Sequence, residues 1–195
     1  MITRDHMDLG CSVCTLGAVG AAHLFHTHNV DSARPIFPPD DRDTPQILWP
    51  NFHSGANGDA QRIEAELPLH PVLHDPESDD GTVRYLPAHP HEGAVAAPAA
   101  DPLARVIATG RSLATGNRFN IAVAFEGSSA GGRAIAESTF HHFADYNWDP
   151  TRGCPDFVTE APGRGLLETP RAMASVHRYV RNVALWLAGQ LEPEP

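Results

Sequence analysis

Short apolar runs separated by glycine-rich or proline-rich turns make up most of the chain. Between residues 119 and 148, two such runs, NIAVAFE and RAIAEST, flank glycines at positions 127, 131 and 132. Two apolar strands joined by a glycine turn predict a β-hairpin in the C-terminal part of the chain. The second strand leads directly into the histidine pair His141 and His142.

The remaining periodicity predicts a short sheet with a helix towards each end. Residues 105–109 read as a buried strand and residues 82–86 as a shorter one, while the first ten residues read as the tail of a strand followed by a turn. Apolar spacing over residues 9–25 predicts an N-terminal helix, and residues 170–189 form the best amphipathic helix, ending at Gly189. Its expected apolar face comprises Met173, Val176, Val180, Val183, Ala184 and Leu187.

Residues 26–69 show little periodicity and are rich in proline and aspartate, so we expect a long loop within the domain. A loop of this length is typical of a binding element, although its aromatic residues could equally hold it down as plain surface. The candidate binding residues in it are Trp49, His53, Asn57 and Asp59.

The composition describes one α/β domain over residues 1–195, with 42% hydrophobic residues and a net charge of −10. All basic residues are arginine, which excludes lysine chemistry, and the acidity argues against nucleic-acid binding. No apolar run is long enough for a membrane span. No signal peptide is recognisable and the cysteine count is odd, so we expect a cytoplasmic protein.

Histidines gather next to acidic residues after three predicted strands. Ligands and catalytic groups collect beyond the carboxyl ends of parallel strands in open α/β sheets, so these segments would form one site if their strands lie side by side. The catalytic candidates are Asp5, His6, Glu92, His141, His142 and Asp145, and the metal-ligand candidates are His89, His91 and His142.

Such a cluster has three interpretations. It could hold a divalent zinc, iron or manganese ion through imidazoles and a carboxylate. It could work without metal, with one histidine as general base oriented by Glu92 or Asp145. It could also be a structural histidine network. Because neighbouring residues on a strand face opposite sides, we expect one of the histidine pair, His142, to face the site.

Several of these segments resemble a known superfamily. The motifs RDHMDLG, LPAHPHEGAV and GRAIAESTFHHFADYNW, with the terminal YVRNVALWL helix, resemble uncharacterised bacterial proteins of the class I glutamine amidotransferase-like superfamily, near the trehalose-utilisation-type proteins. The resemblance implies a partial flavodoxin-like sandwich, with RDHMDLG at a strand-to-helix elbow.

The chain departs from that pattern in two ways. Asp5 and His6 stand where an amidotransferase presents its cysteine, which argues against glutamine hydrolysis. The α/β half that precedes the elbow in relatives is not found before it here, so we expect a homo-oligomer or a partner chain that supplies the missing strands.

The sequence thus leads to two functional hypotheses. The first is an enzyme-like domain that hydrolyses a small polar, carbohydrate-like substrate by acid–base or metal-assisted chemistry; the substrate class comes from the resemblance alone. The second is a non-catalytic binding or assembly subunit whose histidines form a structural network.

Overall fold

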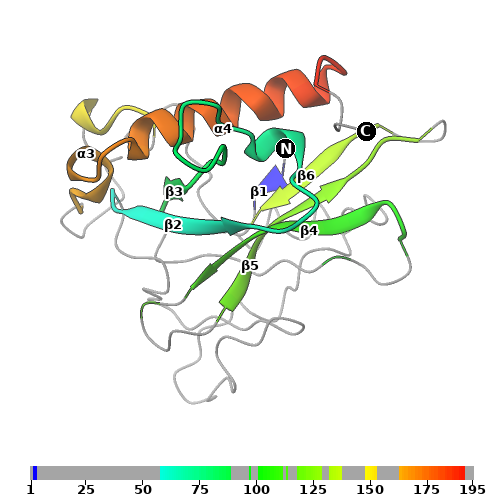
Figure 1. Ribbon diagram of the computed structural model, residues 1–195, viewed down its shortest axis with the longest axis horizontal. Helices are drawn as coiled ribbons and strands as arrows, with labels where there is room; N and C mark the ends of the chain where they lie inside the picture. Colours follow the sequence, from blue (N-terminus) through cyan, green and yellow to red (C-terminus); the bar gives the residue numbers. More distant parts are fainter. Residues whose placement is uncertain are drawn as a thin grey trace.

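The computed structural model describes residues 2–3, 58–88, 97, 101–111, 113, 118–128, 132–137, 148–152 and 163–191. Within these residues the protein is α/β, with a curled sheet packed against helices (Figure 1). The helices among the described residues are α3 (Gly165–Glu168) and α4 (Ala172–Leu187), with the 3-10 turns η2 (Pro71–Leu73) and η3 (Pro150–Arg152).

The sheet has the strand order β1-β6-β5-β4-β2-β3. Every neighbouring pair from β6 to β3 is antiparallel, whereas β1 is parallel to β6. The predicted α/β class is therefore confirmed, but the described strands are not the mainly parallel sheet of a flavodoxin-like fold. The strand bounds are β1 Ile2–Thr3, β2 Ala60–Ala65, β3 Tyr85–Pro87, β4 Ala104–Arg111, β5 Arg118–Phe125 and β6 Ala134–Glu137.

The predicted C-terminal hairpin is present, because β5 and β6 pair with Ala124 opposite Ile135. Every residue of β5 from Phe119 to Phe125 is buried. Phe119, Ile121, Ala122 and Ala124 belong to the main apolar cluster, together with residues of α4, and Val123 and Phe125 belong to a smaller cluster. A strand covered on both faces explains the continuous apolar run in the sequence.

The predicted loop over residues 26–69 is wrong at its C-terminal end, since β2 occupies Ala60–Ala65. This strand pairs with β4 on one side and β3 on the other. Its sequence, AQRIEA, buries Gln61 and Ile63, with the charged Arg62 between them and the charged Glu64 after them. With Ile63 as its one large apolar residue, such a short strand shows almost no alternation to recognise.

The predicted amphipathic helix corresponds to α4, but its buried face is rotated from the expected one. Ala184 and Leu187 are exposed, and Met173 and Val180 are only partly buried. Polar side chains take part in the true inner face because each finds a hydrogen-bond partner there. That face comprises Ala172, Ser175, Val176, Tyr179, Asn182, Val183 and Trp186.

The two ends of α4 have unusual backbone conformations. Arg171, which precedes the first helical residue, has a left-handed φ of 63°. Gly189 follows the helix with a φ of 70°, a conformation that glycine adopts without a Cβ clash. The helix therefore ends at the predicted glycine.

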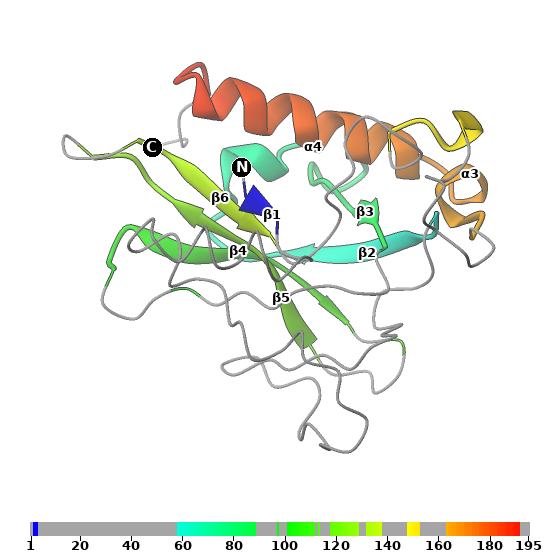
Figure 2. The ribbon, with the colours of Figure 1, turned by 180° about the vertical axis from the view of Figure 1, so that it is seen from behind.

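The helix α4 lies across one face of the sheet in both views (Figure 2). The sheet curls, so that strands near both of its edges reach this helix. Ser175 accepts hydrogen bonds from the backbone N–H groups of Arg84 and Tyr85 at the start of β3. Tyr179, one helical turn further along, donates to Glu137 at the end of β6. The helix thus ties β3 to β6, which lie four positions apart in the sheet order.

The expected helix over residues 9–25 lies outside the described residues. Within the part of the chain that the structure describes, no helix combines the length and apolar character needed to cross a membrane.

Candidate functional site

The ends of β1 and β6 lie side by side at one end of the sheet. The two strands are parallel, with Ile2 opposite Ala136 and Thr3 opposite Glu137. Two of the three histidine-bearing segments therefore leave neighbouring strands in the same direction, as the sequence analysis required for a shared site.

The third segment starts elsewhere. It follows β3, which lies at the opposite edge of the sheet. Alternating antiparallel pairings give β3 the same direction as β6, but four strand-to-strand steps separate them, about 19 Å across a flat sheet. Curling round α4 shortens that path, yet β3 is not a neighbour of β1 or β6. The condition that all three strands lie side by side is therefore met by β1 and β6 and is not met by β3.

Glu137 is the last residue of β6 and has no solvent exposure. Its Oε1 accepts the phenolic hydrogen of Tyr179, which is equally buried. Among the described residues, its Oε2 has no hydrogen-bond partner. A buried carboxyl oxygen without a partner is uncommon in folded proteins and is a reason to look for a function.

Burial sets the charge of this carboxyl group. Desolvation raises the pKa of Glu137 to about 8, although the hydrogen bond from Tyr179 opposes that shift. Burial also raises the pKa of Tyr179, further increased by the neighbouring carboxylate. At pH 7 Glu137 is therefore mainly a neutral carboxylic acid, with Oε2 free to carry the proton.

Of the sequence-predicted site residues, only Asp59 lies within the described residues. The catalytic, metal-ligand and remaining binding candidates all lie outside them: Asp5, His6, Trp49, His53, Asn57, His89, His91, Glu92, His141, His142 and Asp145.

Asp59 contacts the start of α3. Its Oδ1 accepts a hydrogen bond of 3.2 Å from the Gly165 backbone N–H, and its carbonyl oxygen accepts another from Ala88. A methyl group placed on Gly163 would lie 2.0 Å from Asp59 Oδ1. These contacts give Asp59 a structural role in joining β2 to α3.

One described histidine forms the kind of structural network that the second hypothesis requires. His70 is fully buried, with its Nδ1 3.3 Å from the Val72 backbone nitrogen and its Nε2 3.1 Å from Glu126 Oε1. Its ring meets Trp186 edge-on, with 4.9 Å between the centroids. Burial, with the charges of two arginines, lowers the His70 pKa to about 3, so the ring is neutral at pH 7.

Sequence reasoning missed Glu137, Tyr179 and His70. Glu137 carried the clearest signal, because it is the single acidic residue in an otherwise small and apolar strand, AIAE, just before the histidine pair. Tyr179 lies beside the expected apolar face of α4 and gave no signal of its own. His70 stands in a turn sequence, where histidine is usually exposed.

Among the described residues, no group of three or more His, Cys, Asp or Glu side chains could hold a metal ion. Comparisons with protein-family models, curated proteins and solved structures found no match to this chain.

Proposed function

We propose that this chain is a hydrolase-like α/β enzyme whose site lies beyond the carboxyl ends of β1 and β6, and that it acts on a small polar substrate by acid–base catalysis. The observation that carries the proposal is the parallel pairing of Thr3 with Glu137. Through this pairing, the buried and neutral carboxylic acid of Glu137 lies next to the ends of both strands.

The sequence continues from these ends into the catalytic candidates. Asp5 and His6 are the second and third residues after Thr3, and His141 and His142 are the fourth and fifth after Glu137. A chain advances at most about 3.6 Å per residue, so residues this close in sequence to Thr3 and Glu137 must also lie close to the strand ends in space. The proposed common site therefore requires no long connecting segment.

In this mechanism a histidine is the general base that activates water, and an acidic residue orients it. Glu137 keeps a proton at Oε2 near neutral pH and holds Tyr179 by its other oxygen. Its role is to present a neutral donor beside the histidines, where an ionised carboxylate would instead favour their protonation.

Metal assistance is a variant of the same proposal. His89, His91 and His142 would bind divalent zinc, iron or manganese, which would supply an activated water. Since β3 starts from the opposite edge of the sheet, this variant needs the segment after β3 to reach across to the end of β6. The metal-free variant needs no such approach and is the one that the strand order favours.

The flavodoxin-like part of the proposal concerns the β1 edge. β1 is the outermost strand of the described sheet and is parallel to β6. Further parallel strands, from a second copy or a partner chain, would extend the sheet at this edge. Sedimentation velocity tests this point, because a monodisperse monomer would contradict it.

A screen of untagged full-length protein against small aryl esters, aryl glycosides and aryl amides tests the enzymatic proposal. We expect turnover that falls about 100-fold or more in His142→Ala. The exposed His177 on α4 gives the control His177→Ala, which should keep full activity. Absence of turnover and of bound metal, with ligand binding unchanged in His142→Ala and His91→Ala, would overturn the proposal.

The competing proposal is a non-catalytic binding or assembly subunit. The observation that favours it is His70, whose two ring nitrogens are both engaged inside the core. If His6, His141 and His142 titrate like His70, with pKa values far below 6.5, the histidines are structural and this second function holds.

A further inference from the structure

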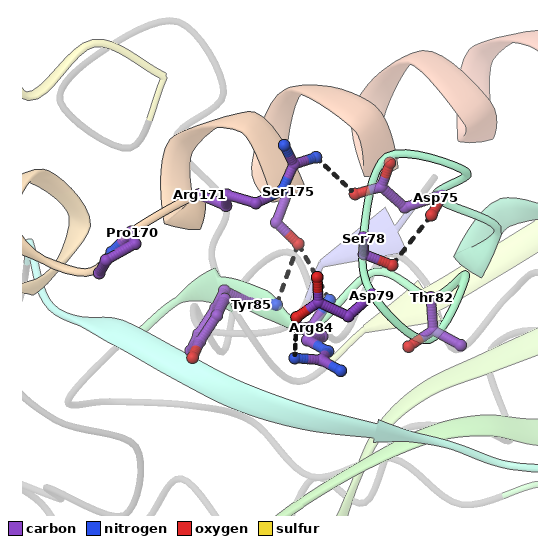
Figure 3. A pocket seen from close by; sticks show the side chains of 9 residues that line it. All are labelled: Asp75, Ser78, Asp79, Thr82, Arg84, Tyr85, Pro170, Arg171 and Ser175. Carbon is purple, nitrogen blue, oxygen red and sulfur yellow. Dashed lines mark hydrogen bonds and ion pairs between the residues drawn. The ribbon is translucent and has the colours of Figure 1, made fainter.

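A pocket separate from the ends of β1 and β6 lies between the start of α4 and the loop that precedes β3 (Figure 3). Its volume is about 250 Å³, which suits a small metabolite. The lining residues are Asp75, Ser78, Asp79, Thr82, Arg84, Tyr85, Pro170, Arg171 and Ser175.

Ser175 supplies this pocket with an unused hydrogen-bond donor. It is only 3% exposed, and its Oγ accepts bonds of 3.0 Å from the backbone N–H groups of Arg84 and Tyr85. A hydroxyl oxygen has two lone pairs, so both acceptor positions are taken. Its hydrogen has no acceptor among the described residues. A buried hydroxyl in this state favours a ligand with an acceptor oxygen.

Arg171 adds a positive charge to the lining. Its Nη2 lies 3.4 Å from Asp75 Oδ2 and 3.5 Å from Glu77 Oε2, both at the long end of ion-pair distances. Within the described part of the chain its Nε and Nη1 have no partner. By contrast, Arg84 is neutralised by Asp80 through contacts of 2.9 and 2.8 Å. Arg171 is therefore the cation available to a ligand.

The facing loop carries the opposite charge. The side chain of Asp79 is 94% exposed, and its ion pair with Arg84 is loose at 3.6 Å. Arg84 is paired with Asp80, and Asp75 is paired with both Arg171 and Arg178, which leaves Arg171 and Asp79 as the charges of opposite sign that are least engaged with other groups. A ligand that carries both charges and no net charge matches this lining better than a simple anion.

The third feature of the pocket is apolar. Tyr85 and Pro170 are part of its lining and lie on the same side of the view (Figure 3). The aromatic ring and the pyrrolidine ring offer a surface to an apolar side chain but few hydrogen bonds.

From these three features we propose that the pocket binds a small apolar α-amino acid. Its carboxylate would accept hydrogen bonds from Ser175 and Arg171, its ammonium group would pair with Asp79, and its side chain would lie against Tyr85 and Pro170. This site is independent of the one at the ends of β1 and β6.

Titration of the full chain with L-leucine, followed by calorimetry and by amide NMR shifts, tests the proposal. We expect saturable binding, with shifts concentrated at residues 75–85 and 170–175. N-acetyl-L-leucine lacks the ammonium charge and L-leucine methyl ester lacks the carboxylate, so each should bind about tenfold more weakly or worse. Glucose tests for a neutral polyol site and should not bind.

Variants of the two charged residues complete the test. Arg171→Gln and Asp79→Asn should each weaken L-leucine binding about tenfold or more, while Arg164→Gln, an exposed arginine outside the pocket, should match the wild type. Arg171→Gly is a second check, because glycine suits the left-handed backbone there and its folding is secure. No binding of L-leucine, equal binding of the ester or the N-acetyl derivative, or unchanged binding in Arg171→Gln and Arg171→Gly would overturn the proposal.

Discussion

Tyr179, in the middle of α4, donates its phenolic hydrogen to the carboxyl group of Glu137 at the end of β6, and both side chains are fully buried. The contact joins the helix to the strand whose end defines the candidate site. Within the part of the chain that the structure describes, Glu137 Oε2 has no partner, so this one residue carries both a structural contact and an unused polar atom.

Removing the Tyr179 hydroxyl should lower the stability of the folded protein. In Tyr179→Phe the buried carboxyl loses the one hydrogen bond that the structure gives it, and we expect the free energy of unfolding to fall by about 1–3 kcal/mol. Chemical denaturation measures this directly. Tyr85→Phe is the matched control, since Tyr85 is only half-buried, and it should stay within about 0.5 kcal/mol of the wild type. Equal losses of stability in Tyr179→Phe and Tyr85→Phe would contradict the predicted role of the Tyr179 hydrogen bond.

Glu137 should also make stability depend on pH. Its pKa is raised to about 8 in the folded protein, so the folded state keeps a proton that the unfolded state releases above about pH 4.5. The contribution of Glu137 is complete below pH 4.5 and is lost as the pH rises through 8. Glu137→Gln stays neutral and can still accept from Tyr179. We therefore expect it to match the wild type near pH 5 and to be the more stable protein at pH 8. A stability difference that does not change with pH would contradict this.

The buried His70 predicts the opposite pH dependence. Its folded pKa of about 3 lies below the ordinary 6.5, so its contribution is present above pH 6.5 and is lost as the pH falls towards 3. His70→Phe should cost about 1–3 kcal/mol at pH 7, because Val72 and Glu126 lose a partner. The variant should lose less stability than the wild type between pH 6.5 and 4. The exposed His74 offers the control His74→Gln, which should keep the wild-type acid sensitivity.

The contact between Asp59 and α3 is testable by adding one methyl group. In Gly163→Ala the new Cβ would lie 2.0 Å from Asp59 Oδ1, so either the carboxylate or the backbone must move. We expect a loss of about 1–3 kcal/mol in thermal or chemical unfolding. At Gly132 a Cβ meets nothing within 4 Å, so Gly132→Ala should change stability by no more than about 0.5 kcal/mol. Similar losses of stability in Gly163→Ala and Gly132→Ala would show that the close approach of Gly163 to Asp59 is not the cause of the loss.

The parts of the fold that followed from the sequence are those with strong local patterns. β4, the β5–β6 hairpin and α4 have continuous apolar runs or helical spacing, and Gly189 ends α4 where expected. The strand β2 was missed because Gln61, Arg62 and Glu64 break up its apolar character. The face of α4 was misplaced because Ser175, Tyr179 and Asn182 are buried through hydrogen bonds to distant segments, which spacing alone does not reveal.

For the candidate site, the sequence indicates only a position on the chain. The motif at residues 133–142 drew attention to the end of β6, and the structure adds that β1 is the parallel neighbour of that strand. Pairing between segments more than 130 residues apart leaves no local trace, and neither does the burial of Glu137. The position of β3 at the opposite edge could not be predicted for the same reason, since the order of strands in a sheet is a property of long-range pairing.

The measurement that tests the central claim most directly is the titration of the Glu137 side-chain carboxyl carbon by ¹³C NMR, assigned by its absence in Glu137→Gln. A buried, proton-holding carboxyl at the end of β6 should titrate with a midpoint near pH 8. It should move higher still in Tyr179→Phe, because the hydrogen bond from Tyr179 lowers the Glu137 pKa. A midpoint at or below about pH 4.5, the ordinary value for a solvated glutamate, would contradict the account.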